Sequence, residues 1–342
     1  MTPRLAVACV LLAAATPAWS QTTGWRDESP HKVTHVEVED GVRLEVLDWG
    51  GSGRALVLLA GLGDSTHVFD DVAPTLAMRY RVIAISRRGH PGSSSPMTGY
   101  TIPRLAEDIV RVMDAVGLTT AVIVGQSFAG EEMHVLAARY PNRVAGLVYV
   151  DAAFDRADRF EAHEAASRAM PAPPRPQPAD LASFAALGAF LTRSGSPPWP
   201  EARLRARYVA NPDGTVRGPW SPEPHVMQAY TAEMRGLTKA YTPERIRVPA
   251  LSLYAVPASP QDLMRPWYPA DDPTIRQKVD ALYPLERENV RRHAAWFIAF
   301  SGSRGLEGKF VRAVEVPGSH DLLITSPREV MGHLDAFVKL LP

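Results

Sequence analysis

Short apolar runs that alternate with helical patterns are the feature that most limits what this chain can fold into. Helical patterns span residues 103–116 and 130–139, and the first has Pro103 in its first turn and Gly117 after its end. Alternating strands and helices predict right-handed crossover connections, so we expect a mostly parallel sheet with helices on both faces. The runs typical of strands buried on both faces are 55–60, 81–85, 121–124 and 144–150.

Further elements flank this region on both sides. Apolar and polar residues alternate over 33–39 and 42–49, which predicts an antiparallel hairpin. After residue 245 we expect a strand, a helix, a last strand and a closing helix. These four elements are predicted at 248–254, within 286–300, within 310–316 and from about 327 to 341.

Residues 152–245 interrupt the alternation. They are rich in proline, carry scattered aromatic side chains, and contain helical patterns at 201–210 and 226–239. We interpret them as a lid inserted into an α/β core. The alternative is a disordered linker, because proline-rich runs such as 171–178 often fail to pack. The two parts of the predicted core are 21–151 and 246–342.

The first residues are typical of a secretory signal peptide. Arg4 precedes an apolar run, 5–15, which small residues follow up to a cleavage position near Ser20. This run is too short to span a hydrocarbon core of about 30 Å. We expect residues 1–20 to be removed and the mature chain to be secreted or periplasmic, without an integral membrane span. The one cysteine, Cys9, lies in this segment, so we expect no disulfide and no cysteine catalysis.

Charge and motif content disfavour several classes of function. Lysine and arginine together number 37, as do aspartate and glutamate, so the chain lacks the basic excess that nucleic-acid binding needs. The sequence has no G-x-G-x-x-G or P-loop motif for a nucleotide, and no H-E-x-x-H or paired-histidine spacing for a metal. We therefore expect a small-molecule substrate and neither cofactor nor metal, and we leave the oligomeric state open.

A serine lies where a buried strand meets a helix. The segment 125–130 reads GQSFAG, with small residues two positions before and two positions after Ser127. In a sharp strand-to-helix turn, the serine adopts a strained backbone conformation, and larger residues at the flanking positions would collide with the neighbouring turns. Such a turn exposes the hydroxyl and aims the helix N-terminus at it. The context therefore predicts a nucleophile at Ser127.

Three motifs together resemble the α/β-hydrolase superfamily, in particular serine esterases and lipases. Residues 59–63 (LAGLG) stand where this family has H-G-x-G, and residues 86–93 (SRRGHPGS) stand where it has D-x-R-G-x-G-x-S. The sequence Gly-Ser-His at 318–320 follows the last predicted strand, which matches the family's order of nucleophile, acid and histidine.

This resemblance implies a mostly parallel eight-stranded sheet and a serine-hydrolase site. Ser127 is then the nucleophile and His320 the general base, while the backbone N–H groups of Leu62 and Phe128 form the oxyanion hole. Three residues depart from the family pattern: Ala60 replaces the usual histidine, Ala129 the second elbow glycine, and Pro91 a loop glycine.

The acid of the triad has more than one candidate. The family most often places it after the seventh strand, but Pro257 and Ala258 stand there, and Asp262 is the nearest carboxylate. Asp151 directly follows the sixth strand, which is the alternative family position, and we favour it. The candidates behind these two are Asp155 and Asp271.

The remaining titratable residues near these motifs are interpreted as structural. His134 is expected to be a packed or surface helix residue, His90 a loop-packing residue, and Glu131 and Glu132 favourable charges at a helix N-terminus.

The expected activity is hydrolysis of a carboxylic ester through an acyl-serine intermediate. A serine in the elbow disfavours dehalogenase and epoxide-hydrolase chemistry, which needs a carboxylate nucleophile. Amide hydrolysis, cofactor-free perhydrolysis, lyase chemistry and a non-catalytic binding role remain alternatives, because one scaffold hosts many functions.

Overall fold

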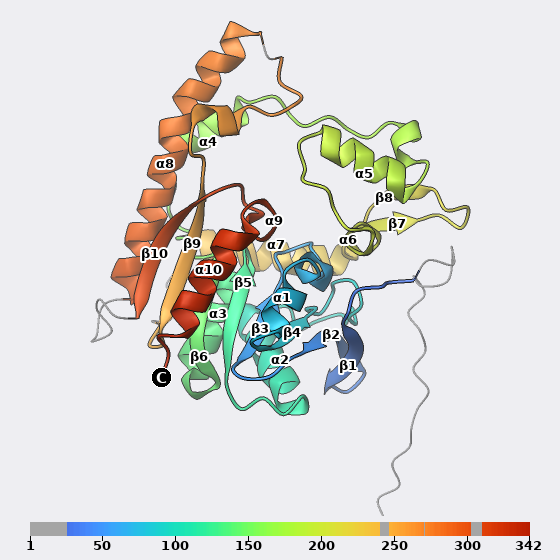
Figure 1. Ribbon diagram of the computed structural model, residues 1–342, viewed down its shortest axis with the longest axis vertical. Helices are drawn as coiled ribbons and strands as arrows, with labels where there is room; N and C mark the ends of the chain where they lie inside the picture. Colours follow the sequence, from blue (N-terminus) through green and yellow to red (C-terminus); the bar gives the residue numbers. More distant parts are fainter. Residues whose placement is uncertain (1–25, 240–245, 270, 302–309) are drawn as a thin grey trace, which may run out of the picture.

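The computed structural model describes residues 26–239, 246–269, 271–301 and 310–342. The predicted signal peptide and Cys9 lie outside these residues. Eight strands form one sheet in the order β1-β2-β4-β3-β5-β6-β9-β10 (Figure 1). The strands are β1 (Lys32–Glu39), β2 (Val42–Gly50), β3 (Ala55–Leu59), β4 (Arg81–Ile85), β5 (Ala121–Gln126), β6 (Val144–Val150), β9 (Ala250–Val256) and β10 (Val311–Pro317).

The sheet is mostly parallel, as predicted. Strand β2 pairs antiparallel with β1 and β4, and the other neighbouring pairs are parallel. The helices outside the segment between β6 and β9 are α1 (Ala73–Ala77), α2 (Ile102–Ala115), α3 (Ala129–Arg139), α8 (Pro273–Ser301), α9 (Leu322–Thr325) and α10 (Pro327–Val338), with 3-10 turns η2 (Thr66–Phe69), η3 (Pro141–Arg143) and η5 (Pro260–Leu263).

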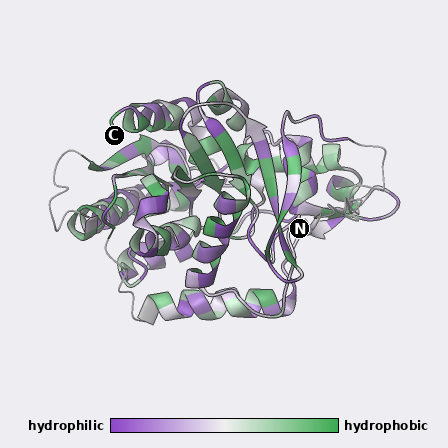
Figure 2. Cartoon of the chain, turned by 90° about the horizontal axis from the view of Figure 1, so that it is seen from below, coloured by the Kyte–Doolittle hydropathy of each residue, from purple (hydrophilic) through white to green (hydrophobic). Residues whose placement is uncertain are grey.

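Apolar side chains of the central strands fill cores on both faces of the sheet. On β3, Val57 and Leu59 join the core that includes residues of α2, α3 and α8, whereas Leu56 and Leu58 join the core that includes residues of α1 and α10. In Figure 2 these strands are mainly green, and the helices around them carry both green and purple faces. Burial on both faces explains why the strands read as continuous apolar runs.

Helices and a small hairpin lie along the chain between β6 and β9. In Figure 1, α4 lies beside α8 at the upper left, and α5, α6 and the β7–β8 hairpin form a separate group at the upper right. Helix α7 contributes Val226 and Tyr230 to a cluster that also contains Phe128 of the elbow. The elements are α4 (Glu161–Arg168), η4 (Pro178–Leu181), α5 (Phe184–Arg193), α6 (Glu201–Arg207), β7 (Tyr208–Ala210), β8 (Val216–Pro219) and α7 (Pro224–Lys239).

Two predicted helices differ from the structure in length. The helix expected at 201–210 ends at Arg207, because 208–210 pair with β8 across an Asn-Pro-Asp-Gly turn in which Gly214 has φ 86°. The helix expected within 286–300 is the second half of α8, which begins at Pro273 and contains Pro284 in its interior. An internal proline removes one backbone hydrogen bond of the helix. Tertiary packing keeps α8 helical on both sides of Pro284.

No helix in the described part of the chain combines the length and apolar character that crossing a bilayer requires.

Candidate active site

The turn between β5 and α3 has the conformation that the sequence predicts. Ser127 has φ 55°, and with Asp151 at φ 47° it is one of two described non-glycine residues with a left-handed backbone. Glycine is required on both sides of the serine: a Cβ on Gly125 would lie 2.3 Å from Met133 Sδ, and one on Gly130 would lie 2.0 Å from the Ala152 carbonyl oxygen. Local backbone strain of this kind is concentrated at functional sites.

His320 and Asp151 meet at the same edge of the sheet. Asp151 follows β6, His320 follows β10, and His320 Nδ1 lies 2.6 Å from Asp151 Oδ2. A carboxylate can only accept, so Nδ1 donates and Nε2 is left to receive a proton. The other carboxylate oxygen, Oδ1, accepts from the Ala255 N–H at 3.0 Å, which fixes the Asp151 side chain.

The carboxylate also sets the basicity of the imidazole. The hydrogen bond that His320 donates to Asp151, and then the charge of that carboxylate, raise the pKa of His320 above its usual value, against the opposing effect of burial. The His320 side chain remains about half exposed, whereas that of Asp151 is buried. Among the described residues, no hydrogen bond joins Ser127 Oγ to His320. Such catalytic contacts often tighten only when substrate binds.

The loop after β3 lies directly over the serine. A Cβ on Gly61 would lie 3.3 Å from Ser127 Cβ and 3.9 Å from its Oγ, a tight contact that glycine avoids. Within the described chain, the N–H groups of Leu62 and Phe128 donate to no protein acceptor. Two backbone donors next to a serine hydroxyl can receive a negatively charged oxygen.

A buried arginine holds this loop in place. Arg87 donates to the carbonyl oxygens of Ala60 at 2.7 Å and Gly61 at 3.0 Å. The same guanidinium forms two hydrogen bonds with Glu132 on α3, at 2.7 and 3.1 Å, and both side chains are buried. Arg87 therefore ties the loop to α3, the helix that follows Ser127. The sequence offered only a weak signal for it, namely a charged residue just after a buried strand.

His90 supports the same loop through its ring. Its Nε2 accepts a hydrogen bond from the Gly63 N–H at 3.1 Å. Burial, followed by the nearby Arg87 charge, lowers the pKa of His90 well below its usual value, so the ring stays neutral and Nε2 can accept. The predicted loop-packing residue thus makes a specific hydrogen bond to the backbone of the loop after β3.

The other acid candidates are engaged elsewhere. Asp262 caps η5 and accepts from the Ser259 N–H at 2.8 Å. Asp155 accepts from the Ala157 N–H in a local turn, and Asp271 is exposed beside Arg276. Of the four candidates, the structure brings only Asp151 to His320.

Two residues of α3 that the sequence suggested as structural are buried. Glu131 pairs with Arg156 at 2.7 Å, and His134 Nδ1 contacts the Gly130 carbonyl oxygen. Burial lowers the pKa of His134, as expected for a packed neutral histidine.

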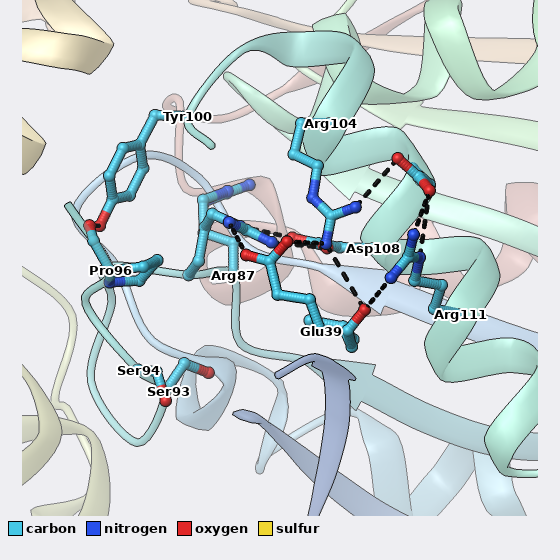
Figure 3. A network of polar contacts seen from close by, with 12 residues as sticks. Glu39, Arg87, Ser93, Ser94, Pro96, Tyr100, Arg104, Asp108 and Arg111 are labelled. Carbon is cyan, nitrogen blue, oxygen red and sulfur yellow. Dashed lines mark hydrogen bonds and ion pairs between the residues drawn. The ribbon is translucent and has the colours of Figure 1, made fainter. Parts of the chain in front are cut away.

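The second arginine after β4 has a different role from Arg87. Arg88 is fully buried and binds Asp108 of α2 through two hydrogen bonds, at 2.7 and 2.9 Å, and Glu39 of β1 through a third at 2.9 Å. Figure 3 shows Glu39, Asp108 and Arg104 of this network beside one another. Arg88 thus ties the segment after β4 to α2 and to the end of β1.

Two cavities lie near the loop after β3. One of about 320 Å³ is bounded by Leu62 and by α7 residues Met227, Tyr230, Thr231 and Met234, with Arg159 and Arg235 also contributing. A larger one of about 440 Å³ is bounded by Glu45, His67, His90 and Trp220. Neither lining includes Ser127, Asp151 or His320, and of the two only the smaller one includes Leu62, from the loop packed over Ser127.

Comparisons with known proteins point to one fold family. A family model described as the α/β-hydrolase fold matches residues 54–222. A Caulobacter segnis protein named as a carbamate hydrolase is 37% identical over 115 residues, which are 33% of this chain and 43% of that protein. A fluoroacetate dehalogenase of Burkholderia sp. is 34% identical over 123 residues, 33% of this chain and 40% of that protein. The matches thus span less than half the length of these curated relatives.

Solved structures agree over nearly the whole chain. The crystal structure of E-2-(acetamidomethylene)succinate hydrolase has 21% identity and a TM-score of 0.59, and the match covers 90% of this chain and 99% of that one. Est816, described as an N-acyl homoserine lactone degrading enzyme, has 22% identity and a TM-score of 0.54, with 89% and 100% covered. The sheet order, the strained serine between β5 and α3, and these likenesses show that the chain belongs to the α/β-hydrolase fold family.

Proposed function

We propose that this protein is a serine hydrolase that cleaves a carboxylic ester through an acyl-serine intermediate. The observation that carries the proposal is the 2.6 Å contact between His320 Nδ1 and Asp151 Oδ2. It lies at the same sheet edge as a serine with φ 55° and a glycine loop packed over that serine.

Each group has a defined step in this mechanism. His320 Nε2 takes the proton from Ser127 Oγ as that oxygen attacks the ester carbonyl, and Asp151 stabilises the imidazolium that forms. The Leu62 and Phe128 N–H groups bind the oxyanion, and one such donor contributes about 10²–10³ in rate. His320 then protonates the leaving alkoxide. In the second half-reaction it removes a proton from water, which attacks the acyl-serine and releases the acid.

Ser127 decides between this chemistry and that of some relatives. Dehalogenase and epoxide-hydrolase mechanisms need a carboxylate at the elbow, and a serine hydroxyl cannot replace it. Amide hydrolysis, perhydrolysis and lyase chemistry use the same groups and are distinguished by substrate. A purely binding role would not need the hydrogen bond between Asp151 and His320.

The cavity beside Leu62 suggests the kind of ester. Leu62, Met227 and Met234 present apolar surface there, in a volume of about 320 Å³. A short or medium apolar acyl or alcohol group fits such a space. In this proposal residues 152–245, which include α7, act as the lid over that group, and the chain is exported after removal of residues 1–20.

The triad assignment is tested by comparing two carboxylate variants on p-nitrophenyl esters of increasing acyl length. Asp151→Asn is expected to lower kcat by about 10³–10⁴, since it removes the group that orients the imidazole. Asp262→Asn is the matched control, because the Asp262 carboxylate caps η5. The kcat of this variant should stay within a few-fold of wild type. If Asp262→Asn loses more activity than Asp151→Asn, the assignment is wrong. If neither ester nor matched amide is cleaved by the wild type, ester hydrolysis is wrong.

A further inference from the structure

Two histidines and two aspartates gather outside the catalytic site. Asp27 and His31 lie just before β1, His67 lies in η2, and Asp70 directly follows η2. One ligand atom from each of the four lies within 4.8 Å of the others. The cluster therefore joins the segment before the sheet to the turn that follows the oxyanion loop.

The cluster is buried and incompletely hydrogen-bonded. The side chains of His31, His67 and Asp70 are 2%, 4% and 5% exposed. His31 Nδ1 and Asp70 Oδ1 lie 3.2 Å apart, at ion-pair distance, but neither atom makes a hydrogen bond of good geometry within the described residues. Buried polar atoms that are not fully hydrogen-bonded are uncommon in native proteins and call for an explanation such as a bound ion.

The spacing of the four side chains suits a tetrahedral cation. Metal-ligand distances of about 2.0–2.1 Å place tetrahedral ligand atoms about 3.3–3.4 Å from one another. Asp27 Oδ2 lies 3.5 Å from both His31 Nε2 and His67 Nδ1, and one ligand atom from each of the four residues lies within 4.8 Å of the others. The 3.2 Å contact between His31 and Asp70 joins the other ring nitrogen, Nδ1, to Oδ1, so it is not an edge of the same tetrahedron. The His67–Asp70 contact, at 2.7 Å, is a hydrogen bond whose proton a cation would displace.

The donor set selects the kind of ion. Two carboxylates balance the charge of a divalent cation, and two neutral imidazoles are ligands that Zn²⁺ accepts readily, whereas Ca²⁺ and Mg²⁺ prefer oxygen throughout. We propose that Asp27, His31, His67 and Asp70 bind one Zn²⁺ ion. Four protein ligands leave no open position, so the ion is structural. The Asp27 side chain, 21% exposed, lies at the solvent side and gives the ion a way in.

This metal site could not be predicted from the spacing of its residues along the sequence. His31 and His67 are far apart along the chain and match no short metal-binding motif, and only the packing of the first segment against η2 brings them together. The expectation that the protein binds no metal rested on short motifs alone. The proposal is independent of the hydrolase assignment, because none of the four residues belongs to the proposed triad or oxyanion hole.

Titration of the whole mature protein with ZnCl₂ tests the proposal. The protein carries no histidine tag, is stripped with a chelator and dialysed, and is followed by calorimetry and by metal analysis after gel filtration. We expect one equivalent of Zn²⁺ bound and a higher Tm with Zn²⁺ than without. Co²⁺ in its place should give the intense visible absorption of a tetrahedral site.

The variants separate this site from other metal contacts. His31→Asn and Asp27→Asn should weaken Zn²⁺ binding more than about 100-fold and abolish the rise in Tm. Loss of a residue that only hydrogen-bonds a ligand lowers metal affinity about 10–100-fold, and loss of the ligand itself should cost more. His35→Asn is the matched control, because this exposed histidine on β1 lies outside the cluster. It should bind as wild type does, as should Ser127→Ala.

Two results would overturn the proposal. One is no stoichiometric Zn²⁺ binding by the wild type, which would mean that protonated histidines alone hold the cluster together. The other is equal Zn²⁺ affinity in His31→Asn, Asp27→Asn and His35→Asn. Asp27 is the most exposed ligand, so its variant is expected to fold even if a buried histidine variant does not. Loss of esterase activity with intact Zn²⁺ binding would bear only on the proposed function.

Discussion

Removal of the Arg87 guanidinium should damage both stability and turnover, for separate reasons. Arg87→Ala leaves the Glu132 carboxylate buried without its partner, and breaking such a pair from one side costs about 3–5 kcal/mol. It also removes the donor to the Ala60 carbonyl and the shorter of two donors to the Gly61 carbonyl, so the loop that carries the Leu62 N–H loses its tie to Arg87. A displacement of about 1 Å there should lower kcat about 10²-fold.

A double variant separates the two effects. Arg87→Met with Glu132→Leu replaces the ion pair by apolar groups, which is often neutral for stability, so most of the lost free energy of unfolding should return. The Ala60 carbonyl still lacks a donor and the Gly61 carbonyl keeps only the Asp64 N–H, so the loop stays loosened and kcat should stay low. The free energy of unfolding is measured by urea titration of tryptophan fluorescence, and kcat with a p-nitrophenyl ester at saturation.

The control is an exposed ion pair of the same chemistry. Arg168 pairs with Glu164 on the surface of α4, and Arg168→Ala should cost no more than about 1 kcal/mol and leave kcat unchanged. The reasoning is refuted if Arg87→Ala destabilises the protein no more than Arg168→Ala. It is also refuted if the double variant regains full turnover.

Three further changes have definite expected outcomes. Asp151 raises the pKa of His320, and the imidazole must be neutral to act as base, so wild-type kcat/KM should rise with pH through a pKa above the usual histidine value. In Asp151→Asn this rise should move to lower pH, and an unmoved rise would contradict the pairing. Gly130→Ala places a Cβ 2.0 Å from the Ala152 carbonyl oxygen and should lower the free energy of unfolding, measured in urea, by about 1–3 kcal/mol. A Cβ at Gly236 on α7 meets nothing within 4 Å, so Gly236→Ala should be neutral or stabilising by about 0.4–1 kcal/mol. Equal effects of the two variants would contradict the packing. His90→Phe removes the acceptor of the Gly63 N–H and should lower kcat about 10-fold or more. Its free energy of unfolding should change little compared with that of Gly130→Ala. An unchanged kcat would show that the bond does not position the loop.

Local patterns predict the parts of this molecule whose causes are local. Runs such as 144–150 are apolar because both faces of the strand are covered, and the small residues around Ser127 reflect crowding within a single turn. The ends of β6 and β10 then place Asp151 and His320 at one edge, which follows from a parallel sheet.

Contacts between distant segments are what the sequence does not reveal. Arg87 contacts Glu132, and His90 accepts from the Gly63 N–H, only because the folded sheet brings these segments together. Likewise, His31 and His67 form a cluster only when the first segment packs on η2. The first half of α8 was not predicted, because a proline such as Pro284 normally ends a helix. Here packing overrides that preference.

Ser127 as the nucleophile is the central claim, and covalent labelling tests it most directly. The purified mature protein is treated with a fluorophosphonate probe, and the modified residue is located by mass spectrometry of peptides. The account predicts one adduct, on Ser127, with none on the Ser127→Ala variant and slower labelling of Asp151→Asn. Absence of label on Ser127, or equal labelling of wild type and Ser127→Ala, would contradict it.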